Sequence, residues 1–168
     1  EIGVDIEGNP VEIAVNEDAA TAAIVFKTVV DPFIGKLTFV KVVAGKLTAD
    51  SPVINMRTGE QERMIKMYYM CGKKQEETKC ICAGDIGAIP KLQHTNTGDT
   101  LCSPTRKVVL EGVTYPEPVL SMAILPKQKG EEDKVAQGVL RLLEEDPTLK
   151  FVNNAETLQM ILSGLGEQ

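Results

Sequence analysis

The cysteines are the first side chains in this sequence that could bind a metal ion or react. There are four of them, Cys71, Cys80, Cys82 and Cys102. A structural zinc site usually uses pairs spaced as C-x2–4-C, and Cys80-Ile81-Cys82 has too few residues between its cysteines. On a strand Cys80 and Cys82 would share one face, whereas Cys71 is distant in sequence. We therefore predict buried free thiols of a cytosolic protein and no metal site.

Candidates for acid, base or nucleophilic catalysis are equally sparse. His94 is the only histidine, and it lies in a loop rich in threonine and glycine, without the G-x-S-x-G turn of a serine hydrolase. The carboxylates of Glu76-Glu77 are typical of a solvated loop, and those of residues 144–146 of a polar helix end. We predict no catalytic residue, and we expect that this chain is not an enzyme on its own.

Two Gly-Lys pairs, Gly35-Lys36 and Gly45-Lys46, invite comparison with a phosphate-binding loop. That loop has the pattern G-x-x-x-x-G-K-[ST], in which backbone amides surround the phosphates. Here positions 30 and 40 are valines, and leucine follows each lysine. The sequence therefore predicts no nucleotide or other cofactor site in this chain.

Basic side chains in the middle of the chain could instead contact an RNA backbone. The net charge of −6 combines +4 over residues 31–107 with acidic flanks, since residues 1–20 hold six acids and no base. This pattern permits phosphate contacts without requiring them, and an unevenly charged solvated surface is the alternative. With 4% aromatic residues and no tryptophan, an extended stacking platform is not expected. The candidates for RNA or interdomain contact are Lys36, Arg57, Arg63, Lys66, Lys73 and Lys74.

Short strands must position these side chains. At residues 31–35 a proline fixes φ and a glycine can take φ > 0, so the apolar runs on either side form a strand, a turn and a strand. Short apolar segments separated by turns continue to about residue 113, and no stretch keeps a 3.6-residue period. We predict a closed β-barrel over residues 21–114, preceded by an acidic linker over residues 1–20. The turn residues on which this interpretation depends are Asp31, Pro32, Gly35, Gly84, Asp85, Gly98 and Asp99.

Residues 115–168 are predicted to form a second domain, because two prolines in Tyr115-Pro116-Glu117-Pro118 interrupt any continuous element. A strand over 119–125 precedes a helix over 131–145, whose apolar stripe is Val135, Val139, Leu142 and Leu143. Strands over 149–152 and 158–162 then flank an Asn153-Asn154 turn. The order β-α-β-β is part of a ferredoxin-like plait. We expect an exposed edge and sheet face, and self-association through this truncated sheet.

Neither a membrane span nor a signal peptide is indicated. No apolar run approaches the ~20 residues needed to cross a bilayer. The first residues lack the basic and apolar regions of a signal peptide. The opening segment is expected to arrive as a linker from a preceding domain.

Several motifs, taken in this order and spacing, resemble the second domain and the start of the third domain of elongation factor G, the ribosomal translocase. The match covers nearly the whole chain after the first twenty residues. Its firmest parts are Phe26-Lys27, residues 31–39, residues 83–88, residues 97–102, Pro116-Glu117-Pro118-Val119, residues 142–148 and residues 163–167.

The resemblance implies a mainly β protein with an α+β part: a barrel of the translation-factor type followed by a partial ferredoxin-like unit. In the family, an upstream GTPase domain binds GTP and magnesium, and hydrolysis drives the movement of tRNA and mRNA. The barrel packs on that domain and contacts small-subunit ribosomal RNA, while the third domain lies between the GTPase switches and a small-subunit protein. The chain is thus expected to be cytoplasmic and to supply docking and relay surfaces, without GTP hydrolysis.

Two departures from the family pattern leave the type of parent protein open. The histidine-containing stretch common in the family is replaced by residues 69–74, and a glycine near the end is Leu158. A ribosomal-protection resistance protein or the related release factor is therefore an alternative. A stand-alone RNA-binding β-barrel module, suggested by the central positive charge, is another.

Overall fold

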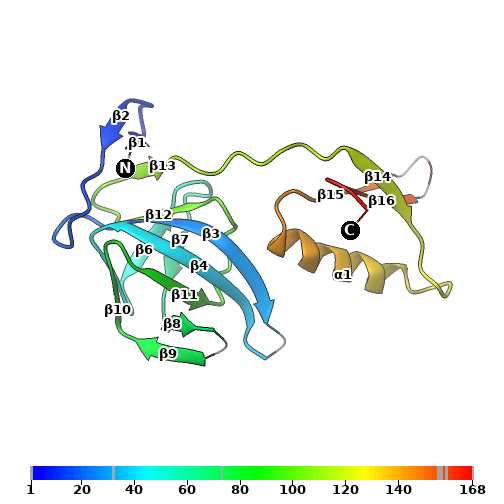
Figure 1. Cartoon of the computed structure of the whole chain (residues 1–168), viewed down its shortest axis with the longest axis horizontal. Helices are drawn as coiled ribbons and strands as arrows, with labels where there is room; N and C mark the ends of the chain where they lie inside the picture. The colour runs from blue at the N-terminus through cyan, green and yellow to red at the C-terminus, as the bar shows by residue number, and fades with distance from the viewer. Residues whose placement is uncertain (1, 32, 73, 155–156, 158, 168) are drawn as a thin grey trace. The chain divides into compact units, whose positions relative to one another are not determined.

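The computed structural model describes residues 2–31, 33–72, 74–154, 157 and 159–167 (Figure 1). The chain divides into two compact units, Glu1–Val113 and Thr114–Gln168. Within the described residues no strand of one unit pairs with a strand of the other. Each unit is therefore described by itself.

The first unit is built on a long hairpin formed by β3 (Ala22–Asp31) and β4 (Gly35–Ala44). Both strands are rich in β-branched and apolar residues, which suit a pleated, buried surface. Their pairing has a register shift between Val25 and Lys27. A bulge of this kind increases the local twist and so helps the sheet to curl.

Further strands extend the hairpin on both sides into an eight-stranded antiparallel sheet with the order β7-β6-β12-β3-β4-β11-β8-β9, and β5 pairs with β10 in a second ladder. The strands curl strongly (Figure 1) around one buried cluster, which confirms the predicted mainly β fold, whereas the sequence predicted a closed barrel. No ladder among the described residues joins β7 to β9, so the sheet is a curled half-barrel. The added strands are β5 (Lys46–Thr48), β6 (Pro52–Asn55), β7 (Gln61–Arg63), β8 (Met67–Cys71), β9 (Lys74–Thr78), β10 (Cys80–Cys82), β11 (Ile86–Pro90) and β12 (Thr100–Cys102).

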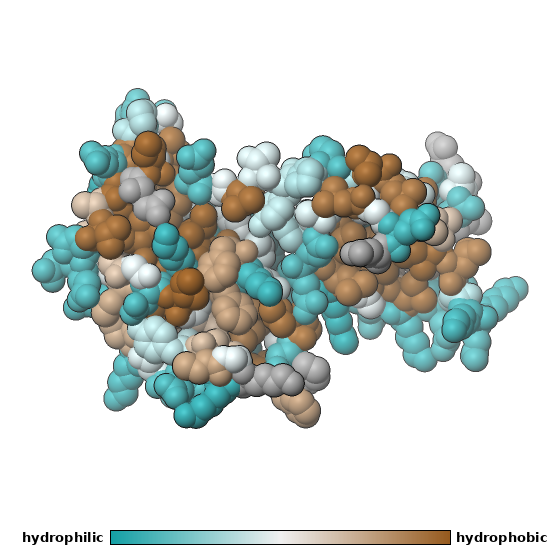
Figure 2. Space-filling model, viewed as in Figure 1, coloured by the Kyte–Doolittle hydropathy of each residue, from teal (hydrophilic) through white to brown (hydrophobic). Residues whose placement is uncertain are grey.

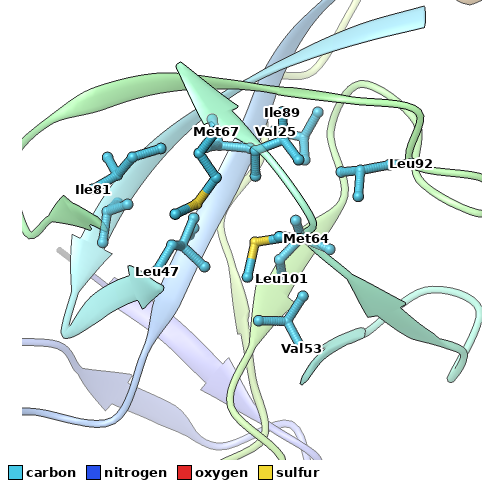
Figure 3. Close-up of a cluster of buried hydrophobic side chains, with 12 residues drawn as sticks. Val25, Leu47, Val53, Met64, Met67, Ile81, Ile89, Leu92 and Leu101 are labelled. Atoms are coloured by element: carbon cyan, nitrogen blue, oxygen red, sulfur yellow. The ribbon is translucent and has the colours of Figure 1, made fainter. Parts of the chain in front are cut away.

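The core of the first unit is aliphatic and includes two methionines, Met64 and Met67 (Figure 3). Both are fully buried, as are Leu101 and Ile89. Methionine is unbranched and flexible, and it can therefore fill irregular gaps between strands. Each side chain buried to this degree stabilises the fold by about 1.5–3 kcal/mol relative to exposure.

Gly45 forms a corner between β4 and β5. Its φ is 68°, and a Cβ atom there would lie 2.5 Å from the carbonyl oxygen of Ala19. Its amide donates to the carbonyl of Asn16 at 2.8 Å, and the Thr21 hydroxyl donates to the carbonyl of Lys46 at 2.8 Å. Only glycine fits a left-handed position with another backbone so close. The segment 16–21 is thus anchored at this corner.

The first residues do not form only the expected acidic linker. They contain β1 (Ile2–Asp5) and β2 (Pro10–Glu12), which join β13 (Val108–Leu110) in a three-stranded sheet. Ile13 is 2% exposed and packs in a second core cluster with Val108 and Leu110. Strand pairing and burial therefore fix this segment to the first unit, although each strand is too short to be recognised by its own periodicity.

The second unit has the predicted order β-α-β-β: β14 (Leu120–Ile124), α1 (Glu132–Glu145), β15 (Lys150–Asn154) and β16 (Gln159–Gly164). The strands form an antiparallel sheet with the order β14-β16-β15. The predicted Asn153-Asn154 turn is wrong, because both residues continue β15 and pair with β16.

Helix α1 packs through a narrower stripe than predicted. Val139 is buried, Val135 and Leu143 are half-buried, but Leu142 is 49% exposed. Leu142 lies at the edge of the stripe, because successive residues are spaced by about 100° around a helix. The helix ends at Asp146, whose amide donates to the carbonyl of Leu142 at 2.9 Å.

The sheet of the second unit exposes apolar side chains on both faces, whereas the sequence predicted one exposed sheet face. Met122 and Val152 are each 57% exposed. The register places them on opposite faces, since Met122 is aligned with Phe151 across β16. Figure 2 shows apolar surface in the region of this unit. Self-association through this sheet stays a prediction.

Membrane insertion through a helix finds no support in the described part of the chain, where no helix has the length and apolar character required to cross a bilayer.

Candidate nucleic-acid interface

The tip of the β3–β4 hairpin presents an aromatic side chain to solvent. The Asp31 carboxylate accepts hydrogen bonds from the amides of Phe33 at 2.8 Å and Ile34 at 2.9 Å, and Gly35 has a φ of 83°. Asp and Gly are the residues that this kind of turn favours. Pro32, the remaining residue of the predicted turn, lies outside the described residues. The turn leaves the Phe33 side chain 96% exposed.

Next to this tip lies an open groove of about 450 Å³. It combines apolar and basic side chains from three segments that are far apart in sequence: the hairpin tip, the connection from β7 to β8, and the end of β11. Ile65, in the connection, is 73% exposed. We call this the tip groove, and its lining residues are Phe33, Ile34, Arg63, Ile65, Lys66, Tyr68, Pro90 and Lys91.

Two basic side chains of the tip groove form exposed ion pairs. Arg63 lies 3.2 Å from Asp50, and Lys66 lies 3.4 Å from Glu77. Exposed pairs of this kind contribute about 0–1 kcal/mol, so a phosphate can compete for either cation. Lys91 has a φ of 62°, which is uncommon outside glycine, and its amide donates to the carbonyl of Lys36 at 2.9 Å.

The structure groups only some of the basic residues that the sequence singles out. Arg63 and Lys66 line the tip groove. Lys36 donates to the side chain of Asn96 at 3.2 Å, and Lys74 pairs with Glu76 at 2.9 Å on β9. Lys73 lies outside the described residues.

The residues of the tip groove that sequence reasoning missed include Phe33, Ile65 and Lys91. Phe33 carried a signal, since a large aromatic residue between a proline and a glycine at a strand turn has no core position to fill. The neighbouring tyrosines Tyr68 and Tyr69 are both half-buried. Tyr68 lines the groove, whereas Tyr69 packs against the main core.

Arg57 does not belong to the groove but to a polar network around Asp99. The Arg57 guanidinium donates to both Asp99 carboxylate oxygens, at 2.6 Å and 2.9 Å. The Asn55 amide and the backbone amide of Asn96 donate to the same carboxylate at 2.8 Å each. The Asp99 side chain is 4% exposed, and that of Arg57 51%. The predicted turn at Gly98-Asp99 is thus fixed by the aspartate itself.

A second buried carboxylate holds the neighbouring loop. Glu62, 5% exposed, accepts from the backbone amide of His94 at 2.7 Å and from the Thr95 hydroxyl at 2.9 Å. His94 itself is exposed and contributes its backbone to this network. The two buried acids therefore hold one loop, which argues that their role is structural.

The electrostatics of Asp99 follow from these contacts. Burial raises the pKa of the Asp99 carboxyl, but the hydrogen bonds from Arg57, Asn96 and Asn55 together outweigh burial and lower the pKa below its ordinary value. The pKa of Arg57 is raised, first by its hydrogen bonds to Asp99. Both groups are charged at neutral pH, and each stabilises the charge of the other.

The Gly84-Asp85 turn holds a second carboxylate in a defined contact. Gly84 has a φ of 95°, and the Tyr69 hydroxyl donates to the Asp85 carboxylate at 2.8 Å. Burial and then this hydrogen bond raise the pKa of the Tyr69 phenol from 10.0 to about 12.

We therefore expect spectrophotometric titration to show a late phenol ionisation that is absent from the Tyr69→Phe variant. The difference between the two titrations should give a pKa of about 12. Because the folded pKa lies above the unfolded value, this phenol contributes stability below about pH 10, which is lost as the pH rises towards 12. Persistence of the late phase in Tyr69→Phe would contradict the assignment.

The cysteines are free thiols, but their burial differs from the prediction. Cys102 is buried, Cys80 and Cys82 are half-buried, and Cys71 is exposed. Cys71 ends β8 at a turn, and Cys80 and Cys82 flank the inward-pointing Ile81 on β10. Period-2 alternation therefore places Cys80 and Cys82 on the outer side.

The Gly-Lys pairs do not form a phosphate cradle. Gly35-Lys36 begins β4, and Gly45-Lys46 is the corner between β4 and β5. Phosphate loops lead into a helix N-terminus, whose amides face the anion. Within the described residues the only helix is α1, which neither pair precedes directly. Neither Gly-Lys pair therefore has the geometry of a phosphate-binding loop.

Comparison with known proteins agrees with this architecture. The profile for elongation factor G domain 2 matches residues 20–104, and the profile for elongation factor G domain III matches residues 115–168. A protein from Thermus thermophilus with a known crystal structure shares 30% sequence identity with this chain, and the two structures superpose with a TM-score of 0.76. The match covers 89% of this chain but 23% of that protein, so the chain spans about a quarter of its length. Since the two profiles follow each other across both units, this chain belongs to the elongation factor G family of translation factors.

Proposed function

We propose that the first unit docks onto small-subunit ribosomal RNA through the tip groove, as part of a longer translocase whose GTPase activity lies elsewhere. The observation that carries this proposal is the juxtaposition of a nearly fully exposed Phe33 with Arg63, Lys66 and Lys91 in one groove. Membership of a translation-factor family supports a ribosomal partner in general terms.

The chemistry of the groove suits an unstacked nucleotide and its phosphates. An aromatic ring provides a surface for a base, and such stacking is worth about 1–3 kcal/mol per base. The basic side chains lie on the same groove and can pair with the adjoining phosphates. Although aromatic residues are rare in this chain, Phe33 and Tyr68 suffice for one stacking site. An extended single-stranded platform would need more of them.

The second unit is proposed to relay movement between the GTPase domain of the same parent chain and a small-subunit ribosomal protein. Its exposed apolar residues on both sheet faces, Met122 and Val152, support a role in contacts with other domains or molecules. GTP and magnesium are proposed to bind to the GTPase domain of the parent, and membership of the elongation factor G family supports this assignment.

A stand-alone RNA-binding module is the second candidate, and the same groove favours it. The two candidates differ in the affinity that they predict for isolated RNA compared with the intact ribosomal subunit. A module would bind isolated RNA as strongly as it binds the ribosomal subunit, whereas a docking surface requires the folded subunit to present the RNA. The groove supports either type of parent protein, a main translocase or a ribosomal-protection or release-factor relative.

Cosedimentation with purified small ribosomal subunits tests the proposal. We expect binding by the 168-residue chain at low salt, with an affinity that falls as salt is raised. For about three phosphates neutralised, the slope of log K against log salt should be about −2 to −3. Subunits whose RNA has been nicked by ribonuclease should bind less of the chain. Subunits whose proteins have been trimmed by protease should bind as much of the chain as intact subunits do. Absence of binding at low salt, or binding that is independent of salt, would refute the RNA assignment.

A further inference from the structure

Strand β10 places two thiols side by side on the outside of the first unit. The Sγ atoms of Cys80 and Cys82 are 3.8 Å apart. Ile81 between them points inward, is fully buried and belongs to the main core cluster. Because alternate residues of a strand lie on one face, the two sulfurs are adjacent and half-accessible.

Two sets of contacts fix the position of β10 and therefore of its two thiols. The strand pairs with β5, with Cys80 opposite Thr48 and Cys82 opposite Lys46. On its inner side Ile81 packs over Gly87, where a Cβ atom would lie 2.1 Å from the Ile81 Cδ1 atom. The absence of a side chain at Gly87 therefore leaves space for Ile81. Because Ile81 points inward, the side chains of Cys80 and Cys82 point outward.

A direct disulfide suits this geometry poorly. Residues i and i+2 of a strand have Cα atoms about 6.6–6.8 Å apart, the upper end of the range in which a disulfide closes without backbone movement. The pairing with β5 and the burial of Ile81 oppose such movement.

We propose that Cys80 and Cys82 form a two-sulfur binding site for a soft monovalent cation of low coordination number, namely Cu(I). At a metal–sulfur distance of about 2.3 Å, sulfurs separated as here subtend an angle of about 110° at the ion, between tetrahedral and trigonal values. The sulfur positions therefore need little adjustment on binding. Thiolate sulfur is also the ligand type that selects Cu(I).

The choice of ion follows from the ligands that surround the pair. Within the described residues no cluster of three or more histidine, cysteine, aspartate or glutamate side chains could hold a metal ion, so a four-ligand zinc site of protein side chains is not supported. Cu(I) accepts two thiolates, with water or a free thiol as a third ligand. Binding is a plain exchange without redox change: Cu(I) is taken up, both thiols lose their protons, and the bound site carries a net charge of −1.

The test is transfer of Cu(I) from its bicinchoninate complex to the reduced full chain under anaerobic conditions. The transfer is measured as the decrease in absorbance of the Cu(I)–bicinchoninate complex. We expect one Cu(I) per chain. Cys80→Ser and Cys82→Ser should each weaken binding by more than the about 10–100-fold that loss of an outer-shell partner costs. The matched control is Cys71→Ser, which removes an exposed thiol of the same unit and should leave binding unchanged.

Three outcomes would overturn the proposal: no transfer to the wild type, transfer unaffected by either serine variant, or equal loss in Cys71→Ser. Urea denaturation followed by circular dichroism reports whether each variant keeps its fold. A variant that keeps the stability of the wild type and loses Cu(I) has lost the site and not the structure.

Discussion

Replacing Asp99 by alanine should lower the free energy of unfolding of the first unit by about 2–4 kcal/mol, the largest stability effect that we expect from one polar side chain. The variant leaves the Arg57 guanidinium, the Asn55 amide and the Asn96 backbone amide without their common acceptor. Asn55 is fully buried, so solvent cannot replace the lost partner there. Urea denaturation followed by circular dichroism measures the change.

The matched control is Glu76→Ala, which removes the partner of Lys74 in an exposed pair on β9. That variant should change stability by less than about 0.5 kcal/mol. If Asp99→Ala and Glu76→Ala behave alike, the network around Asp99 does not stabilise the fold as argued.

The same carboxylate makes the stability of the first unit sensitive to acid. Its folded pKa is lower than the ordinary value of 3.8, because the hydrogen bonds from Arg57, Asn96 and Asn55 outweigh the opposing effect of burial. Its contribution is therefore complete above that value and is lost as the pH falls through the folded pKa. The difference in stability between wild type and Asp99→Ala should accordingly shrink below about pH 4.

Replacing Phe33 by alanine should weaken binding to small ribosomal subunits by about 5–150-fold, which corresponds to a stacking energy of about 1–3 kcal/mol. Because the side chain is 96% exposed, the change should leave the free energy of unfolding nearly unaltered. Phe33→Tyr should restore most of the affinity, since it keeps the aromatic face. Cosedimentation at fixed salt measures all three proteins.

Variants of charged residues and of an exposed apolar residue outside the groove distinguish stacking on Phe33 from non-specific binding. Arg63→Gln and Lys66→Gln should each reduce the salt slope by about 1, since each removes one phosphate contact. Ile86→Ala changes an exposed apolar residue at the other end of β11, away from the groove, and should bind as wild type does. Equal weakening by Phe33→Ala and Ile86→Ala would contradict a specific site at the hairpin tip.

The elements with strong local signals could be predicted from the sequence. A proline and a glycine indicate the β3–β4 hairpin, and acidic residues followed by a helical spacing of apolar residues indicate α1. A pair of prolines indicates the domain boundary before β14. The three-residue strands β2 and β13 carry no such signal. They form because the segments meet in space, and pairing supplies the backbone partners that their own residues cannot provide.

The candidate site was less accessible to sequence reasoning than the fold. Arg57 and Arg63 have the same formal charge and lie close in sequence, yet one is held by a buried carboxylate and the other faces the groove. That distinction depends on where Asp99 lies after folding. The groove itself combines residues from positions 33–34, 63–68 and 90–91, and no local pattern links them.

The corner at Gly45 has a mechanical consequence. Since Asn16 and Thr21 are held at it through backbone and hydroxyl contacts, a force on the N-terminal strands would reach the half-barrel through this corner as well as through the pairing of β1 with β13. Detaching these strands would therefore require two separate sets of hydrogen bonds to break, and cutting either set alone would leave the segment attached.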